Sequence, residues 1–234
     1  QGLNGVFLKA RWLPSTHFTF RWDTNSLGSL LGDIMKMTED LLQREQPYAF
    51  LLLGDTNTGL SSLIAKRMKI PVYHMEAGNR CFDENVPEET NRRVIDHLAD
   101  FNLVYTEHAR RNLLAEGLSA RRIMLTGSPM REVLNYYADG IAASDVMARL
   151  GIRKNEFFLV SAHRQENVDN PARLDELLTC LQAVAQKWGL PVLVSTHPRT
   201  KQKLDTRGAH EIPGVQFHEP FGFFDYCHLQ TKAL

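Results

Sequence analysis

The chain has 234 residues, and its 27 lysines and arginines balance its 27 aspartates and glutamates, so the formal net charge is zero with neutral histidines. A chain of this length can bury the core of one large α/β domain or of two smaller ones. Because the charges cancel, no long-range field attracts nucleic acid or an anionic membrane, and neither partner is expected.

The cysteines are few, odd in number and widely spaced, at positions 81, 180 and 227. This usage argues against a disulfide framework and against a closed zinc site, and it favours a reducing cytoplasm. No apolar run approaches the roughly 20 residues that a membrane-spanning helix needs, and the first residues lack the order of a signal peptide. The sequence begins with Gln1 and stops inside an expected helix at 228–234, so we expect truncation at both ends.

Apolar spacing predicts a helix from Leu27 to near Pro47, behind candidate caps at 24–26. The continuous apolar run 48–53 follows, and such a run is typical of a strand covered on both faces of a parallel sheet. The alternation then repeats, which predicts a βαβ series. Further helices are expected at about 57–68, 87–99 and 107–116, and further strands at 70–75, 101–106 and 123–126.

A second set of elements begins after Pro129, where a helical stretch leads into the region 138–152. We then expect a strand at 157–161, a helix with Asn170 as its cap and a stop at Gly189, and a strand at 192–196. We place the boundary between two lobes inside the region 138–152. The predicted lobes are therefore residues 1–140 and 141–234.

Polar side chains directly follow several predicted strands, and ligands of open parallel sheets bind outside the carboxyl ends of the strands. In the first lobe these residues are Asp55, in a small-residue turn, and Glu76, before an Ala-Gly turn. In the second lobe the two strands at 157–161 and 192–196 run into His163-Arg164 and His197-Pro198-Arg199. Two carboxylates of one lobe would thus face two His-Arg pairs of the other.

Asp55 and Glu88 also have ordinary structural explanations, whereas Glu76 is harder to explain in that way. Asp55 either acts on a ligand or only caps its own helix. Glu76 ends an apolar strand where water is partly excluded, which favours a functional role. Glu88 lies in the first turn of the helix 87–99, where acids stabilise the positive end of the dipole. The pairs Glu88/Arg92 and Glu89/Arg93 are each four residues apart, so one pair can be solvated while the other points into a cleft.

Cofactor and metal signatures are absent from the pattern. His74 and Glu76 alternate on one strand and so raise the possibility of a metal site, but no third ligand has metal spacing. No GxGxxG follows a strand and no GxxxxGK[ST] occurs, so neither a nicotinamide site nor a Walker loop is predicted. The polar loop with Asn79-Arg80 and Asp83-Glu84 either closes over a ligand or is solvated. Tyr105 is interpreted as a packing residue.

Six blocks, in this order, resemble the non-hydrolysing UDP-N-acetylglucosamine 2-epimerase family. They are Gly54-Asp55-Thr56, His74-Met75-Glu76-Ala77-Gly78, Pro87-Glu88-Glu89-Thr90-Asn91-Arg92, Asp96-His97-Leu98-Ala99-Asp100, Thr126-Gly127-Ser128-Pro129 and Ser161-Ala162-His163-Arg164. The stretch 79–87 is closer to the branch that makes capsule and O-antigen sugars, including epimerases of UDP-2-acetamido-2,6-dideoxyhexoses, than to the UDP-GlcNAc/UDP-ManNAc branch.

The resemblance implies two Rossmann-like lobes of the GT-B type, with parallel sheets flanked by helices and the nucleotide sugar between the lobes. Both lobes would be incomplete here, because the family's N-terminal Gly-Thr-Arg-Pro-Glu loop and its C-terminal Ser-Gly-Gly loop do not occur in this sequence. The implied reaction inverts C2 of a UDP-N-acetylhexosamine by eliminating UDP and adding it back, without any cofactor or metal. The implied partners are a UDP-sugar and a second copy in a homodimer.

The resemblance also implies roles for individual residues. Asp55, Glu76 and Glu88 would be the carboxylates that move the C2 proton and stabilise positive charge at the anomeric carbon. His163 would assist the departure of UDP, and Arg92 and Arg164 would add positive charge near the diphosphate. In addition, His197 matches a residue that belongs to a regulatory substrate site in some members.

Other functions remain open at this point. A GT-B glycosyltransferase would share the fold, since fold does not fix function, although the Pro-Glu-Glu-Thr-Asn-Arg block argues against it. An inactive nucleotide-sugar-binding fragment would stay without activity even when the missing loops are restored. A hydrolase would release UDP and free sugar irreversibly.

Overall fold

The computed structural model describes residues 18, 23, 25–161, 170–196 and 212–234. Two compact units divide the chain between Arg131 and Glu132, and we call them the N-terminal and the C-terminal unit. The boundary predicted at 140/141 falls within helix α7 (Ala138–Ala142) and stays a prediction.

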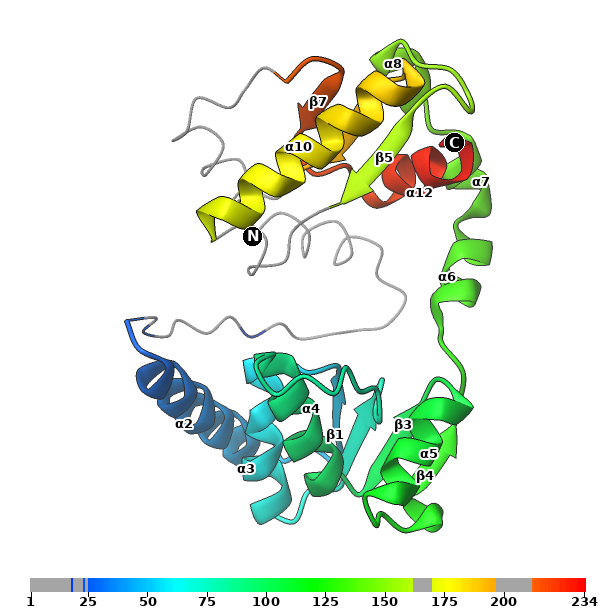
Figure 1. The fold of residues 1–234 in the computed structure, drawn as a ribbon. Helices are drawn as coiled ribbons and strands as arrows, with labels where there is room; N and C mark the ends of the chain where they lie inside the picture. Colours follow the sequence, from blue (N-terminus) through cyan, green and yellow to red (C-terminus); the bar gives the residue numbers. More distant parts are fainter. Residues whose placement is uncertain (1–17, 19–22, 24, 162–169, 197–211) are drawn as a thin grey trace. The chain divides into compact units, whose positions relative to one another are not determined.

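The N-terminal unit is built on a four-stranded parallel sheet in the order β1-β2-β3-β4, as the strand–helix alternation predicted (Figure 1). The strands are β1 (Phe50–Leu53), β2 (Val72–Met75), β3 (Phe101–Val104) and β4 (Ile123–Leu125). The helices are α2 (Leu27–Glu45), η1 (Asn57–Ser61), α3 (Ser62–Arg67), α4 (Pro87–Leu98), α5 (Glu107–Ala115) and η2 (Ala120–Arg122).

One face of this sheet carries the apolar core. Leu42 of α2 and Ala65 of α3 pack against Val72, while Leu113 of α5 packs against Val104. The opposite face of β1 is open, because Leu51 and Leu53 are 62% and 60% exposed. The expected coverage of this strand on both faces is therefore not met.

The C-terminal unit contains a three-stranded parallel sheet in the order β5-β6-β7. Helix α10 covers one face of the sheet through Leu181 and Ala185, and Leu229 of α12 packs on the other face against Leu193. The strands are β5 (Phe158–Ser161), β6 (Val192–Ser195) and β7 (Val215–His218), and the remaining helices are α6 (Met130–Tyr136), α8 (Val146–Leu150), α10 (Pro171–Trp188) and α12 (Phe223–Lys232). Strand β7 was not predicted from the sequence.

Local capping explains where the long helices begin and end. The side chain of Ser26 accepts a hydrogen bond from the Ser29 N–H at the start of α2. In α10, Asn170 accepts from the N–H groups of residues 172 and 173, and Gly189 ends the helix at φ 64°. These side chains and the glycine satisfy backbone groups that have no partner inside the helix. The predicted caps at 26 and 170 and the stop at 189 are confirmed.

Helix α4 begins at Pro87 as predicted, and its first turn holds the preceding loop in place. The buried carboxylate of Glu89 accepts hydrogen bonds from the Cys81 N–H at 2.9 Å and from Arg93 Nε at 3.0 Å. Burial alone would raise the pKa of Glu89, but these hydrogen bonds and the positive charge of Arg93 hold the pKa below its ordinary value. Glu89 thus ties the middle of the loop between β2 and α4, at Cys81, to the start of the helix.

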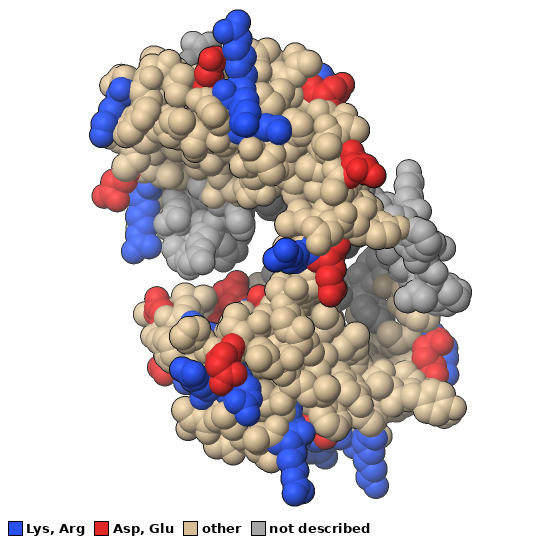
Figure 2. Space-filling model, turned by 90° about the vertical axis from the view of Figure 1, so that its right-hand side faces the viewer, with Lys and Arg blue, Asp and Glu red and all other residues tan. Residues whose placement is uncertain are grey.

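Charged side chains of both signs are interspersed over each unit on the face drawn in Figure 2, in keeping with the balanced charge of the sequence. None of the helices in the described part of the chain combines the length and the apolar character that crossing a bilayer requires.

Gly78, in the turn after β2, packs closely against α5. It has φ +76°, and a Cβ there would lie 2.4 Å from the Ala109 carbonyl oxygen. Gly78→Ala is expected to lower the free energy of unfolding by about 3 kcal/mol, from backbone strain plus the clash. Gly117 is the matched control, since it has φ +87° with nothing within 4 Å. Gly117→Ala should cost only about 1 kcal/mol in urea unfolding followed by circular dichroism, and equal losses would contradict the steric argument.

Glu89→Gln is expected to lower the free energy of unfolding by about 1–2 kcal/mol at pH 7. Since the pKa of Glu89 is depressed from 4.5 in the folded state, its contribution is present above that value and is lost as pH falls through the folded pKa. The difference between the variant and the wild type should therefore narrow on acidification. Urea titrations at several pH values measure it, and Glu84→Gln, at an exposed position of the same loop, is the control.

Candidate active site

The turn after β1 meets one face of helix α4. Arg92 forms an ion pair with the Asp55 carboxylate, and Asn91 Nδ2 donates to the Asp55 carbonyl oxygen at 2.9 Å. The helix η1 that follows has Thr56 as its N-cap and no side-chain cap hydrogen bond. Asp55 therefore does not cap its own helix, and its carboxylate faces the guanidinium of α4 instead.

Glu76 lies at the same edge of the sheet, directly after β2. Arg92 Nη1 donates to the Glu76 carbonyl oxygen at 2.6 Å, and Arg92 Nη2 lies 3.9 Å from Glu76 Oε1. The side chains of Asp55 and Glu76 are 23% and 36% exposed, whereas that of Arg92 is 10% exposed. One largely buried cation thus holds two carboxylates that both remain open to a ligand.

The backbone of Glu76 is in the left-handed region, with φ 65°. A residue with a side chain is uncommon there, because its Cβ crowds the backbone, and the conformation costs on the order of 1 kcal/mol or more. Such a conformation persists only where the surroundings hold it. At the end of β2 this conformation turns the chain sharply, and the Glu76 carboxylate lies beside Gly54. A Cβ on Gly54 would be 3.4 Å from Glu76 Oε2.

Glu88 is exposed in the first turn of α4, three and four residues before Asn91 and Arg92. This spacing puts the three side chains on one side of the helix. The neighbouring pair Glu89/Arg93 forms the expected i,i+4 ion pair, at 3.0 Å. The two pairs therefore have separate roles, because Arg92 turns to Asp55 while Arg93 stays with Glu89.

Tyr105, which the sequence analysis interprets as a packing residue, lies near Glu76. It follows β3 at the carboxyl edge and is partly buried. Burial and the nearby negative charge of Glu76 raise the pKa of its phenol. The packing interpretation stays a prediction, since partial burial is compatible with it.

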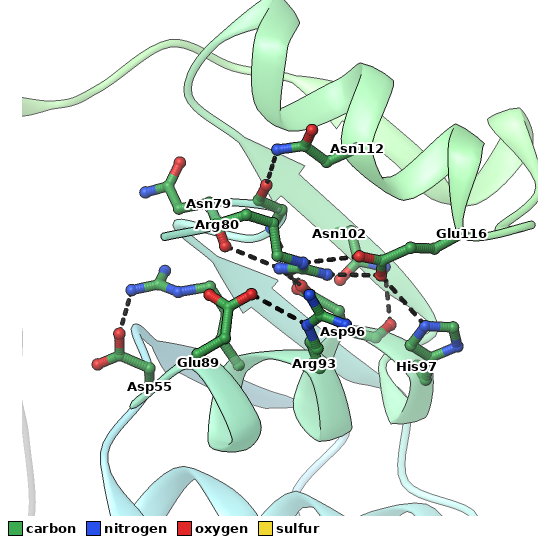
Figure 3. A network of polar contacts seen from close by, with 12 residues as sticks. Asp55, Asn79, Arg80, Glu89, Arg93, Asp96, His97, Asn102, Asn112 and Glu116 are labelled. Atoms are coloured by element: carbon green, nitrogen blue, oxygen red, sulfur yellow. Dashed lines mark hydrogen bonds and ion pairs between the residues drawn. The ribbon is translucent and has the colours of Figure 1, made fainter. Parts of the chain in front are cut away.

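A buried network supports this edge of the sheet from behind (Figure 3). The fully buried Arg80 side chain donates to Asp96 Oδ2 at 2.8 Å and to both oxygens of Glu116, at 2.7 and 2.6 Å. Burial works against the charge of Arg80, but the hydrogen bonds and charges of the two carboxylates raise its pKa. Asp83 and Glu84 are exposed, as the solvated alternative for this loop predicted, but the guanidinium of Arg80 is an internal cross-link.

The structure brings Asp55, Glu76 and Arg92 together and places Glu88 on the adjoining helix face. The other predicted site residues, His163, Arg164 and His197, lie outside the described residues. Within the described part of the chain, no group of three histidine, cysteine, aspartate or glutamate side chains has an arrangement that could hold a metal ion.

Several known proteins of similar sequence or structure are named as UDP-sugar 2-epimerases. The chain matches the family described as UDP-N-acetylglucosamine 2-epimerase over residues 3–234. A UDP-2,3-diacetamido-2,3-dideoxy-D-glucuronate 2-epimerase from Pseudomonas aeruginosa is 29% identical over 99% of this chain and 64% of its own length.

Two solved structures are also similar to this chain. The UDP-N-acetylglucosamine 2-epimerase from Rickettsia bellii is 42% identical with a TM-score of 0.81, covering 90% of this chain and 56% of that one. The enzyme from Methanocaldococcus jannaschii, in complex with UDP-GlcNAc and UDP, is 30% identical with a TM-score of 0.89, covering 98% and 65%.

The chain thus spans less than two thirds of the length of each of these relatives. The family match nevertheless extends over almost all of its residues, and the solved relatives share its parallel sheets flanked by helices. The chain belongs to the UDP-N-acetylglucosamine 2-epimerase family.

Proposed function

We propose that the protein containing this chain is a nucleotide-sugar epimerase that inverts C2 of a UDP-N-acetylhexosamine. The observation that carries the proposal is the pair of partly exposed carboxylates, Asp55 and Glu76, held by Arg92 at the carboxyl edge of a parallel sheet. Family membership supports the same assignment, because relatives of this chain are named for that reaction.

The chemistry of the substrate explains why carboxylates are needed. The C2–H bond of the sugar is not adjacent to a carbonyl group, so a base alone does not remove the proton. In the proposed reaction the C2 proton passes to a carboxylate while the C1–O bond to UDP breaks, and a C1=C2 double bond forms. A proton then returns to the opposite face of C2 as the UDP oxygen bonds again to C1. Atoms and electrons balance over these two steps without an oxidant, so the reaction requires no nicotinamide cofactor.

The site residues take roles that suit this sequence of steps. Asp55, Glu76 and Glu88 transfer the proton and stabilise positive charge that develops at C1 as UDP departs. Arg92 keeps the first two carboxylates in place through its contacts with both turns. The strained backbone of Glu76 supports its role, because residues held in sparsely populated conformations concentrate at functional sites.

The remaining assignments rest on the family resemblance. His163 would assist the departure of the diphosphate, with Arg164 as an additional positive charge, and His197 would belong to a second, regulatory substrate site. The substrate would be UDP-GlcNAc, UDP-ManNAc or a 6-deoxy analogue, and the diacetamido relative indicates that altered sugars are accommodated in the family. A cytoplasmic location and a homodimer remain predictions.

Solvent exchange at C2 tests the function directly. In D₂O, the full-length protein is expected to produce the C2 epimer of a UDP-N-acetylhexosamine with deuterium at C2, which ¹H NMR detects. UDP-GlcNAc and a 6-deoxy UDP-HexNAc should be compared, since the faster substrate identifies the branch. Release of free sugar would favour a hydrolase, and the absence of exchange for both substrates would favour a transferase or a binding protein.

Removing a carboxylate charge should slow the reaction without unfolding the protein. Asp55→Asn, Glu76→Gln and Glu88→Gln are each expected to lower kcat by about 10²–10⁴-fold, the usual contribution of a positioned acid or base. Glu45→Gln is the control, because this exposed glutamate ends α2 before β1, at the amino edge of the sheet. Wild-type kcat in the Glu88 variant, with folding checked by circular dichroism, would remove that residue from the mechanism.

A further inference from the structure

The backbone on both sides of Asp55 is held by hydrogen bonds. Helix α4 supplies one side, where Asn91 binds the Asp55 carbonyl oxygen and Arg92 binds its carboxylate. Strand β2 supplies the other side, where His74 Nε2 lies 2.8 Å from the Gly54 carbonyl oxygen. His74 is completely buried, so it acts on a ligand only through the groups that it holds.

Both ring nitrogens of His74 face acceptors. The Gly54 carbonyl oxygen has no hydrogen to give, so Nε2 must be the donor of that contact. Nδ1 lies 2.8 Å from Asp96 Oδ1. Asp96 also accepts hydrogen bonds from the Gly78 N–H and from Arg80, as an ionised carboxylate does. Both ring nitrogens are therefore engaged, Nε2 by the turn after β1 and Nδ1 by helix α4.

The surroundings leave the ring of His74 little freedom to turn. The side chains of His74 and Asp96 are both 0% exposed, and Arg80 also pairs with Asp96. The buried ring therefore keeps both of its contacts.

The contact with Gly54 matters because the backbone dihedral angles of a glycine are little restricted by its own side chain. Gly54 has φ +78°, and a glycine without restraint populates many backbone conformations. Rotation of the peptide between Gly54 and Asp55 would swing the Asp55 side chain away from the site. The donor on His74 fixes the oxygen of this peptide and thereby the direction of the Asp55 side chain.

The same pair of residues also reaches the second carboxylate. Asp96 accepts a hydrogen bond from the Gly78 N–H, at 3.2 Å to Oδ2, in the turn that begins with Glu76. His74 and Asp96 therefore connect the turn of Asp55 to the turn of Glu76 through three hydrogen bonds. This connection is additional to the one that Arg92 makes between the same two turns.

We propose that His74 is a positioning residue of the site, a buried imidazole whose orientation Asp96 fixes and that sets the placement of the Asp55 carboxylate through the Gly54 carbonyl oxygen. The inference rests on the proposed epimerase function. It assigns to His74 no contact with the substrate, and it separates two hydrogen bonds with different consequences. The bond to Gly54 controls catalysis, whereas the bond to Asp96 controls the orientation of the ring.

Two amide variants separate these bonds. The terminal amide of His74→Gln reaches the position of Nε2 and keeps the donor to Gly54, whereas the shorter amide of His74→Asn takes the place of Nδ1 and faces Asp96. Neither variant keeps both ring contacts, so both should lose stability. In the full-length enzyme we expect His74→Gln to retain kcat within about tenfold, and His74→Asn to lose about a hundredfold with KM changed less than about threefold.

The control is His97→Gln, because His97 is the exposed histidine at the outer end of the network, 3.3 Å from Glu116. Its kcat per folded molecule should stay within about twofold of the wild type. A purely structural His74 would give equal kcat values per folded molecule in the Gln and Asn variants, and that outcome would overturn the positioning role. Greater activity of the Asn variant would overturn it as well.

A readout independent of turnover is the long-range ¹H–¹⁵N NMR correlation of the His74 ring in the chain itself. Donation to the Gly54 carbonyl oxygen predicts a hydrogen on Nε2, and a ring whose Nε2 carries no hydrogen would contradict the proposal. If the wild type shows no exchange at C2, the proposed function fails and the positioning role in that reaction fails with it, while the NMR result still decides the state of His74. If the wild type turns over and the two variants do not differ, only the positioning role fails.

Discussion

The buried carboxylate of Asp96 is the group on which the arrangement of the site depends. A charge without access to water is stable only when it is paired and hydrogen-bonded, and Asp96 meets this requirement with three partners. The partners belong to different segments, since His74 lies on β2, Gly78 in the turn after it and Arg80 in the following loop. The hydrogen bonds to this one carboxylate thus fix the chain from β2 through the following turn to Arg80 in the loop.

Helix α4 connects this buried support to the open side of the site. Because the helix repeats every 3.6 residues, Asn91 and Arg92 reach the turn after β1, and Asp96, one turn later, reaches the end of β2. An adjoining stripe of the same helix holds the loop through Glu89. A change in the rotation of the helix about its axis would displace all of these contacts at once, which is why a well-defined start at Pro87 matters.

The fold was largely predictable because its signals are local. Caps and stops such as Asn170 and Gly189 act within one helical turn, and the apolar runs of the strands are separated by clear helical patterns. Strand β7 lacks such a signal, because among its four residues only Val215 is buried and Gln216 is exposed. It exists through its pairing with β6, which is a tertiary interaction. The open face of β1 shows the same limit, since an apolar run does not reveal which of its faces is covered.

The site was predictable in its carboxylates but not in their partners. Asp55 and Glu76 follow from the rule that ligands bind at the carboxyl ends of parallel strands. Local spacing assigned Arg92 to Glu88, yet Arg92 pairs with Asp55, 37 residues away in the sequence, because the fold brings them together. Arg80 shows the same principle, since its position in a polar loop indicates exposure while two carboxylates draw it inside. Residue types at strand ends identify what chemistry is available. Long-range pairing of buried charges determines where each group is held. Since many proteins share this kind of sheet, the pairing distinguishes this site from the same edge in other proteins.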